Sequence, residues 1–318
     1  MDKFEFEEMV RSQSKLSVAV YGPSGSGKTT AAIKLAMGIR DELYPGEKLS
    51  DIGLFIDTER RSSTKAVGRR VGGETLEPLG FYNFEPPFDI YKLIELIEYA
   101  VAKGKKIIVT DSATAFWSGY QGILENVAEL DVKLADAKKM YGAWSEKEII
   151  AKKNALKNFM TNSDAHMIVC FRAKTEYVME ANARGKMVPK AVGLKEDMQA
   201  DVRYEFDTVL SLDKETHEVS VVKDRIGYLE IRETNEHPEA PLTVEDGKLL
   251  ARLVAEGLSL EEIAARKRQR LISFVLDEKE HKSSKVKMFE DTKSVTITPE
   301  YLEKFTYEQL LTLVKYLK

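Results

Sequence analysis

The sequence is poor in the residues that build disulfide and metal frameworks. Its 318 residues include one cysteine and four histidines. Cys170 stands in an apolar run and is interpreted as a small core residue, which excludes a disulfide framework. The scattered histidines give no zinc-ligand spacing. Stability must come from a hydrophobic core, and a chain of this length with 43% hydrophobic residues can form one large domain and a smaller one.

Long apolar runs and a strong excess of one charge are also lacking. No apolar run approaches the roughly 20 residues of a membrane-spanning helix. The formal net charge is −4, which argues against a protein that coats nucleic acid. Any contact with DNA would have to come from local basic patches. The acidic first ten residues do not resemble a signal peptide. We therefore expect no membrane partner and a cytoplasmic location.

Apolar stretches alternate with helical periodicities through the first 240 residues. Helical spacing of apolar residues is clearest over 28–43 and 88–104, and residues 117–163 are mostly helical in pattern. Strands are expected over 16–22, 52–57, 105–112 and 166–173, followed by a hairpin over 206–213 and 217–224. Strands that alternate with helices predict an α/β fold with a mainly parallel sheet that is finished by antiparallel strands.

The character of the sequence changes after about residue 240. Two capping boxes, which begin at Ser259 and Thr306, mark expected helices, and a lysine-rich polar stretch separates them. We predict a core over 1–240 and a helical extension over 241–276 that packs on it. A polar linker over 277–297 and a small helical module over 298–318 are expected to follow. The last module is interpreted either as a docking module for DNA or protein or as part of an oligomer interface.

The strongest motif is GPSGSGKT, which matches G-x-x-x-x-G-K-[ST] between an expected strand and an expected helix. Its glycines let backbone N–H groups point at phosphate oxygens, and the helix N-terminus favours an anion. Lys28 is expected to reach the β- and γ-phosphates, and Thr29 to ligate Mg²⁺. ATP with Mg²⁺ is the expected ligand, and the predicted binding residues are Gly22, Pro23, Ser24, Gly25, Ser26, Gly27, Lys28, Thr29 and Thr30.

Two carboxylates stand at the ends of neighbouring strands. Asp111 ends the strand KKIIVTDS and is expected to be the second Mg²⁺-associated carboxylate (Walker B). Glu59 follows the strand of LFIDTER, where a carboxylate can orient and partly deprotonate a water for in-line attack on the γ-phosphate. The alternative is a solvated loop acid beside Arg60 and Arg61. Asp57, two residues earlier, is interpreted as structural.

In this order, the motifs resemble RecA/RadA-type P-loop ATPases, in particular the compact RecA-like ATPases of phages linked to single-strand annealing and recombination. The resemblance covers about 15–240 and rests on GPSGSGKT, LFIDTE, IIVTDS, AW, HMIVCFRAK and VVKDRIG. An AAA+ ATPase usually places its water-activating glutamate directly after the Walker B aspartate, where this chain has Ser112. RecA-like proteins place it at the end of the neighbouring strand, where Glu59 stands. The resemblance implies a RecA-like ATPase in the host bacterial cytoplasm.

The Lys-x-Arg pair of VVKDRIG has a counterpart in RecA-like motors. There, the resemblance implies, the basic residues project across a subunit interface onto the γ-phosphate bound by the neighbour. Lys223 and Arg225 are two residues apart, so they should share one strand face while Asp224 points away. This implies an ATP site shared within a homo-oligomer, either a ring or a filament. The alternative is a surface-exposed basic strand end neutralised by nearby acids.

The resemblance also implies a γ-phosphate sensor after the fourth strand, where Arg172 or Lys174 stands. Many relatives carry glutamine there, and the alternative is an arginine that caps a strand end. The segment 172–195 has six basic residues against two acidic ones, is not expected to pack as regular structure, and matches the DNA-binding loop in position. A solvated hairpin is the alternative. Its predicted DNA contacts are Lys174, Tyr177, Arg184, Lys186 and Lys190.

The leading interpretation is a DNA-dependent ATPase that assembles on single-stranded DNA in annealing, recombination or repair. Single-strand-binding or recombination proteins are candidate partners. One alternative is a ring-shaped DNA helicase or a helicase loader. Another is a nucleotide-switched protein-interaction module, regulatory or counter-defence in role, that DNA does not stimulate.

Overall fold

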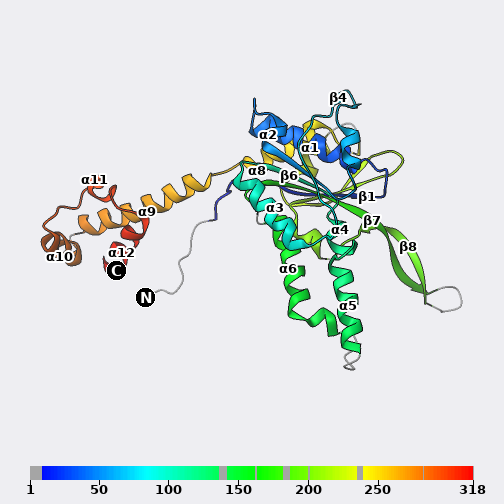
Figure 1. The fold of residues 1–318 in the computed structure, drawn as a ribbon. Helices are drawn as coiled ribbons and strands as arrows, with labels where there is room; N and C mark the ends of the chain where they lie inside the picture. Colours follow the sequence, from blue (N-terminus) through cyan, green and yellow to red (C-terminus); the bar gives the residue numbers. More distant parts are fainter. Residues whose placement is uncertain are drawn as a thin grey trace. The chain divides into compact units, whose positions relative to one another are not determined.

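The computed structural model of the chain describes residues 9–135, 142–161, 163–181, 187–199, 201–234, 239–281 and 283–317. The chain folds into two compact units (Figure 1). The larger is Ser14–Ala255, and the smaller joins Met1–Gln13 to Glu256–Lys318. Across the described ranges, no helix has both the length and the apolar character needed to cross a membrane.

The larger unit is built on a mainly parallel sheet. Its strands are β1 (Ser17–Gly22), β2 (Gly53–Asp57), β5 (Gly80–Asn83), β6 (Ile107–Asp111), β7 (His166–Ala181), β8 (Met187–Glu196), β9 (Thr208–Leu212) and β10 (Val219–Asp224). The strand order is β10-β9-β1-β7-β6-β2-β5, and β8 pairs with β7 beyond this path. Among these strands, β10 and β8 run antiparallel to their partners, β9 and β7, and the other pairs are parallel. The predicted mixed α/β fold is confirmed.

Helices cover both faces of this sheet. They are α1 (Lys28–Leu43), α2 (Leu49–Ile52), α3 (Ile90–Ala102), α4 (Thr114–Ser118), α5 (Ile123–Ala135), α6 (Lys147–Thr161), α7 (Tyr228–Arg232) and α8 (Val244–Ala255). Successive residues of β1 point to opposite faces, so Val18 and Val20 join the core beneath α1 and α8, whereas Ala19 and Tyr21 join the core beneath α3 to α6. Shorter elements are η1 (Ser62–Ala66), β3 (Arg70–Val71), β4 (Glu74–Thr75), η2 (Gly142–Ser145) and η3 (Val202–Glu205).

Helix α8 lies against α1 at a very close crossing. A Cβ atom on Gly38 of α1 would lie 2.2 Å from the carbonyl oxygen of Val244, and one on Gly247 of α8 would lie 2.5 Å from that of Leu35. These two glycines therefore let the helix backbones approach each other. The first part of the predicted helical extension packs on the core in this way.

The smaller unit is a helical module with its own core. It contains α9 (Leu260–Glu280), α10 (Ser284–Lys293), α11 (Pro299–Leu302) and α12 (Tyr307–Leu317). Both expected capping boxes form, at Ser259 and Thr306. The stretch expected to be a polar linker is instead largely helical, because Val286 and Ile297, spaced among its lysines, are buried in this core. Helix α9 was expected to pack on the core as part of the extension over 241–276, but it belongs to this module instead, because its Ile272 and Val275 are buried in the module's core.

Candidate nucleotide-binding site

The P-loop joins β1 to α1 at the edge where the parallel strands end, which we call the carboxyl edge. Gly25 and Gly27 have φ angles of 87° and 88°, a left-handed backbone that glycine adopts without steric cost. Gly27 is also the residue that precedes the first turn of α1. The predicted residues from Gly22 to Thr30 therefore form a strand end, a tight loop and a helix N-terminus.

The loop fits an anionic ligand. Lys28 is buried, and its Nζ donates hydrogen bonds to the carbonyl oxygens of Gly22 at 2.9 Å and Pro23 at 2.8 Å. The hydroxyl of Ser26 is buried and has no hydrogen-bond partner among the described residues. A buried ammonium, an unpaired hydroxyl and a helix N-terminus together suit the phosphate groups of a nucleotide.

Thr29 and Asp111 supply the oxygen atoms of a metal site. The Thr29 hydroxyl donates to Asp111 Oδ2 at 2.6 Å. Burial raises the pKa of Asp111 to about 6, against the opposing effect of the Thr29 hydrogen bond. A hydroxyl beside a desolvated carboxylate fits Mg²⁺, which prefers oxygen ligands, and these two residues would hold it. The ion would supply neutralising charge at the phosphate oxygens.

Asp57 is a structural residue of the same edge. It ends β2 and is 1% exposed. Its Oδ1 accepts hydrogen bonds from the backbone N–H groups of Glu59 at 2.7 Å and Arg61 at 3.2 Å, and its Oδ2 accepts from the N–H of Ser63 at 3.0 Å and from the Ser63 hydroxyl. This carboxylate is fully used in fixing the turn that presents Glu59, in agreement with its structural interpretation.

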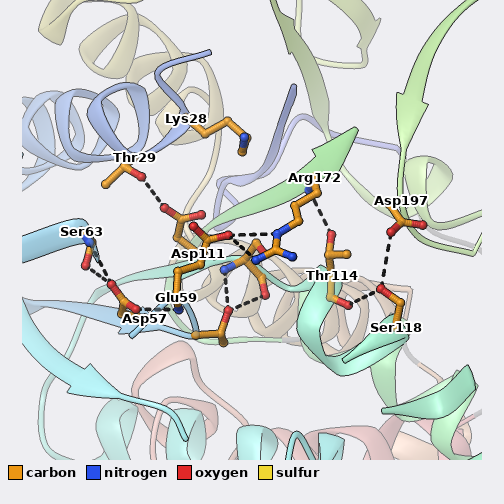
Figure 2. Close-up of polar contacts among 12 residues, drawn as sticks. Lys28, Thr29, Asp57, Glu59, Ser63, Asp111, Thr114, Ser118, Arg172 and Asp197 are labelled. Carbon is orange, nitrogen blue, oxygen red and sulfur yellow. Dashed lines mark hydrogen bonds and ion pairs between the residues drawn. The ribbon is translucent and has the colours of Figure 1, made fainter. Parts of the chain in front are cut away.

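Glu59 and Arg172 form an ion pair at the carboxyl edge. The Nε and Nη2 atoms of Arg172 lie 3.0 and 2.9 Å from Glu59 Oε1 (Figure 2). The two residues are 113 positions apart in the chain. They meet because β7 and β2 flank β6, the strand that ends in Asp111. The edge thus brings together the predicted Lys28, Thr29, Glu59, Asp111 and Arg172.

Three polar residues behind Arg172 were not identified from the sequence. The backbone N–H of Arg172 donates to the Thr114 hydroxyl at 3.0 Å, and its carbonyl accepts from the N–H of Asp197 at 2.6 Å. Asp197 also pairs with Lys174 at 2.8 Å. It accepts a hydrogen bond from the Ser118 hydroxyl at 3.4 Å (Figure 2). No sequence motif marks these residues, because Thr114 and Ser118 of α4 meet Asp197, which follows β8, only in the folded chain.

The predicted DNA-contacting segment forms regular structure. Strands β7 and β8 pair antiparallel from Ala173 and Glu196 to Ala181 and Met187, and the ribbon extends away from the sheet (Figure 1). The expectation of an irregular segment is therefore wrong, since β7 continues beyond the sheet and its residues pair with β8. Of the predicted contacts, Lys174 binds Asp197, Tyr177 lies on β7 and Lys190 on β8, whereas Arg184 and Lys186 fall outside the described residues.

Lys223 and Arg225 contact one short stretch of backbone. The Nζ of Lys223 donates to the carbonyl oxygens of Arg203 at 3.0 Å and Tyr204 at 2.8 Å, and also to that of Phe206. Arg225 Nη2 donates to the same Tyr204 oxygen at 2.6 Å. Both cations therefore lie on one side of the strand end, as the sequence spacing predicts.

The contacts of Asp224 and the register of β10 with β9 show where Lys223 and Arg225 lie in the sheet. The Asp224 carboxylate accepts from the N–H groups of Ile226 and Leu229 and so begins α7. Lys223 pairs with Val209 near the start of β9. Because β9 runs parallel to β1, the pair lies at the opposite, amino edge of the sheet, about 10 Å along the strand from the level of the P-loop.

Comparison with known proteins gives a family. A search of curated proteins finds no match to this chain. A family model described as AAA domain matches residues 14–238, which is well over half of the chain and includes the P-loop, Glu59, Asp111 and Arg172. A phosphate loop with an adjoining magnesium-type oxygen pair is what such a nucleotide-binding ATPase requires. The chain therefore belongs to the AAA-domain family of P-loop ATPases.

Proposed function

We propose that this chain is a RecA-like motor that hydrolyses ATP on single-stranded DNA in phage annealing, recombination or repair. The observation that carries the proposal is the place of Glu59. It lies in the turn that follows β2, the strand next to β6. Ser112 follows Asp111 in the position where another branch of these ATPases carries its glutamate. The RecA-like arrangement is the one this geometry supports best.

Each residue of the carboxyl edge has a role in the reaction. Lys28 binds the β- and γ-phosphates, and Glu59 orients the attacking water and accepts its proton as the water oxygen bonds to the γ-phosphorus and the bond to the ADP oxygen breaks. The ion pair with Arg172 must open before Glu59 can serve the water. Arg172 has an exposed side chain, so a γ-phosphate can compete for its guanidinium. Arg172 would then be the sensor.

The ATP site is completed by a second copy of the chain. Lys223 and Arg225 lie at the amino edge, away from the P-loop of their own subunit, which supports a role toward the phosphate of a neighbour. The carbonyl groups around Tyr204 hold both cations in position. A cation supplied across the interface would stabilise charge that develops on the transferred phosphoryl group. Assembly and hydrolysis would then be coupled.

The DNA contact is proposed for the β7–β8 hairpin. The first strand of this hairpin, β7, also carries Arg172. At the base of the hairpin, the N–H of Asp197 donates a hydrogen bond to the Arg172 carbonyl. Occupancy of the hairpin and the state of the Glu59–Arg172 pair would therefore be linked. Basic side chains would follow the phosphates, with an aromatic ring for base stacking. The residues concerned are Lys174, Tyr177, Arg184, Lys186 and Lys190.

One experiment tests this function. ATP hydrolysis is measured with and without single-stranded DNA, and oligomer mass is measured with a non-hydrolysable ATP analogue. We expect DNA to raise the rate and the analogue to promote assembly. Strand displacement on a forked duplex would instead identify a helicase. Assembly with a protein partner, with no effect of DNA on hydrolysis, would overturn the DNA-dependent motor in favour of a nucleotide switch.

A further inference from the structure

The connection between β2 and β5 carries an unbalanced charge. Over residues 60–70 the sequence has five cations and no acidic residue. All five side chains are exposed. They belong to Arg60, Arg61, Lys65, Arg69 and Arg70. This basic connection begins directly after Glu59 and crosses toward α1, against which Ala66 packs.

These five cations have no acidic partners among the described residues, unlike two cations of helix α1. On and beside α1, Lys34 pairs with Glu74 at 3.0 Å and Arg40 with Glu77 at 2.8 Å. By contrast, none of the five cations of the basic connection forms an ion pair with any residue that the structure describes. Their charge is therefore available to an external anion.

The start of the basic connection is held in a strained conformation. Arg60 and Arg61 have φ angles of 55° and 63°, in the left-handed region that non-glycine residues rarely adopt. The buried Asp57 accepts the N–H of Arg61 and so maintains this turn. Strain of this kind persists only where the surroundings enforce it, and it clusters at functional sites.

An aromatic ring lies beside these cations. The guanidinium carbon of Arg61 is 5.5 Å from the centroid of the Phe81 ring. Phe81 belongs to β5, the last strand of the sheet, and remains 37% exposed. Cations next to an accessible ring form the combination by which proteins hold the phosphates of a single strand and stack one of its bases.

We propose that the basic connection and Phe81 bind the backbone and a base of single-stranded nucleic acid. The proposal rests on the proposed function, because it names a second contact for the same DNA, separate from the hairpin. Arginine, four of the five cations, matches phosphate oxygens with two parallel donors. Five cations spread over a connection of this length suit a ligand with repeated phosphates, whereas a single nucleotide is already served by the P-loop. A strand bound here passes beside Glu59.

The test measures binding of a labelled oligothymidylate over a series of salt concentrations. Lys65→Gln with Arg69→Gln removes two exposed charges whose side chains form no hydrogen bond or ion pair with the described residues. We expect the slope of log affinity against log salt to fall by about 1.4 and affinity at 0.1 M salt to drop roughly 25-fold. The control, Lys48→Gln with Lys103→Gln, removes two exposed charges that precede β2 and β6 at the amino edge, and should leave both quantities unchanged.

A second variant separates stacking from charge. Phe81→Leu should weaken binding roughly tenfold with an unchanged salt slope. Thermal melting verifies that each variant is folded. An unchanged slope in the charge variant, beside a wild-type protein that binds, overturns this contact and leaves the proposed function standing. A wild-type protein that does not bind overturns both. Loss of self-association with an unchanged slope assigns the basic connection to a protein contact and also overturns the proposal.

Discussion

The two edges of the sheet use charge in opposite ways. At the carboxyl edge, Asp111 is a buried acid with a raised pKa, and Ser26 has a buried hydroxyl without a partner in the described part of the chain. At the amino edge, Lys223 and Arg225 are bound to backbone carbonyls. The carboxyl edge therefore presents polar groups that suit a ligand, whereas the cations of the amino edge already have partners within the chain.

This difference underlies the proposal that two copies of the chain together form one ATP site. The polar groups of the carboxyl edge gain partners when a nucleotide arrives, which favours binding. The cations of the amino edge are too far along β9 to help in the same subunit. In the proposed oligomer each copy contributes its carboxyl edge to one site and its amino edge to another. The following predictions test this division.

The largest effect is expected when the two edges are disabled in different subunits. Lys28→Ala alone should abolish turnover, and Arg225→Ala alone should lower it by about 10³-fold, as for a cation supplied in trans. In oligomers formed from an equal mixture of the two variants, one subunit interface in four combines an intact Lys28 with an intact Arg225. We therefore expect about a quarter of the wild-type rate. Phosphate release measures it, and Lys48→Ala, exposed at the amino edge, is the control.

If phosphate release did not recover in oligomers proven to contain both variants, Arg225 would not act on the ATP site of a neighbouring subunit. Arg225 would then support the backbone around Tyr204 in its own subunit. A fall in the thermal midpoint of Arg225→Ala would accompany that outcome.

A smaller loss is expected at Glu59. Glu59→Gln keeps the shape of the side chain and removes its capacity to accept a proton, so hydrolysis should slow by about 10²–10⁴-fold while nucleotide affinity is kept. Single-turnover hydrolysis and nucleotide titration measure the two quantities. Glu85→Gln is the matched control, since Glu85 is an exposed acid after the next strand, β5. Equal rates in Glu59→Gln and wild type would rule out Glu59 as the base.

Packing beneath the P-loop helix should have a moderate effect on stability. Ala at position 38 would place its Cβ 2.2 Å from the Val244 carbonyl and 2.6 Å from the Lys248 nitrogen, both of them backbone atoms of α8. We expect Gly38→Ala to lower the free energy of unfolding by about 1–3 kcal/mol, measured by urea denaturation. A gain of about 1 kcal/mol, the intrinsic preference of a helix for alanine, would show that this close crossing is dispensable.

The amino edge should make stability depend on pH through His166. Its Nδ1 accepts the N–H of Leu16 at 3.1 Å, and its Nε2 lies 3.1 Å from the Tyr44 hydroxyl. Burial first, and then the charge of Lys15, lowers the pKa of His166 from 6.5 to about 3. Between these values the unfolded chain binds the extra proton, so the stabilisation is complete above pH 6.5 and is lost as the pH falls.

The expected effect of His166 on the free energy of unfolding is modest. From pH 7 to pH 5 we expect the wild type to lose about 2 kcal/mol relative to His166→Gln, which cannot titrate. Urea denaturation at a series of pH values measures the difference, and the variant is its own control for the other titrating groups. Parallel curves for the two proteins would mean that His166 is accessible to protons in the folded state.

Local patterns were enough for part of the candidate site. The P-loop, Asp111 and Glu59 each stand at the end of a short apolar strand, and parallel strands bring such ends to one edge. The face shared by Lys223 and Arg225 also follows from local spacing. By contrast, the β7–β8 hairpin was only the alternative to an irregular segment, and helix α10 was missed, because strand pairing or burial of a few apolar residues outweighed a polar composition.

Neighbours in the chain were enough to predict a phosphate loop, a carboxylate expected to bind the metal and a carboxylate expected to orient the water, because each lies next to a short apolar strand in the sequence. Tertiary structure alone decided that Arg172 pairs with Glu59, 113 residues away, and that Lys223 and Arg225 lie at the edge opposite the P-loop. The physical reason is the order and direction of the strands. Contacts between residues far apart in sequence are set by which strands lie side by side, and no local pattern contains that order.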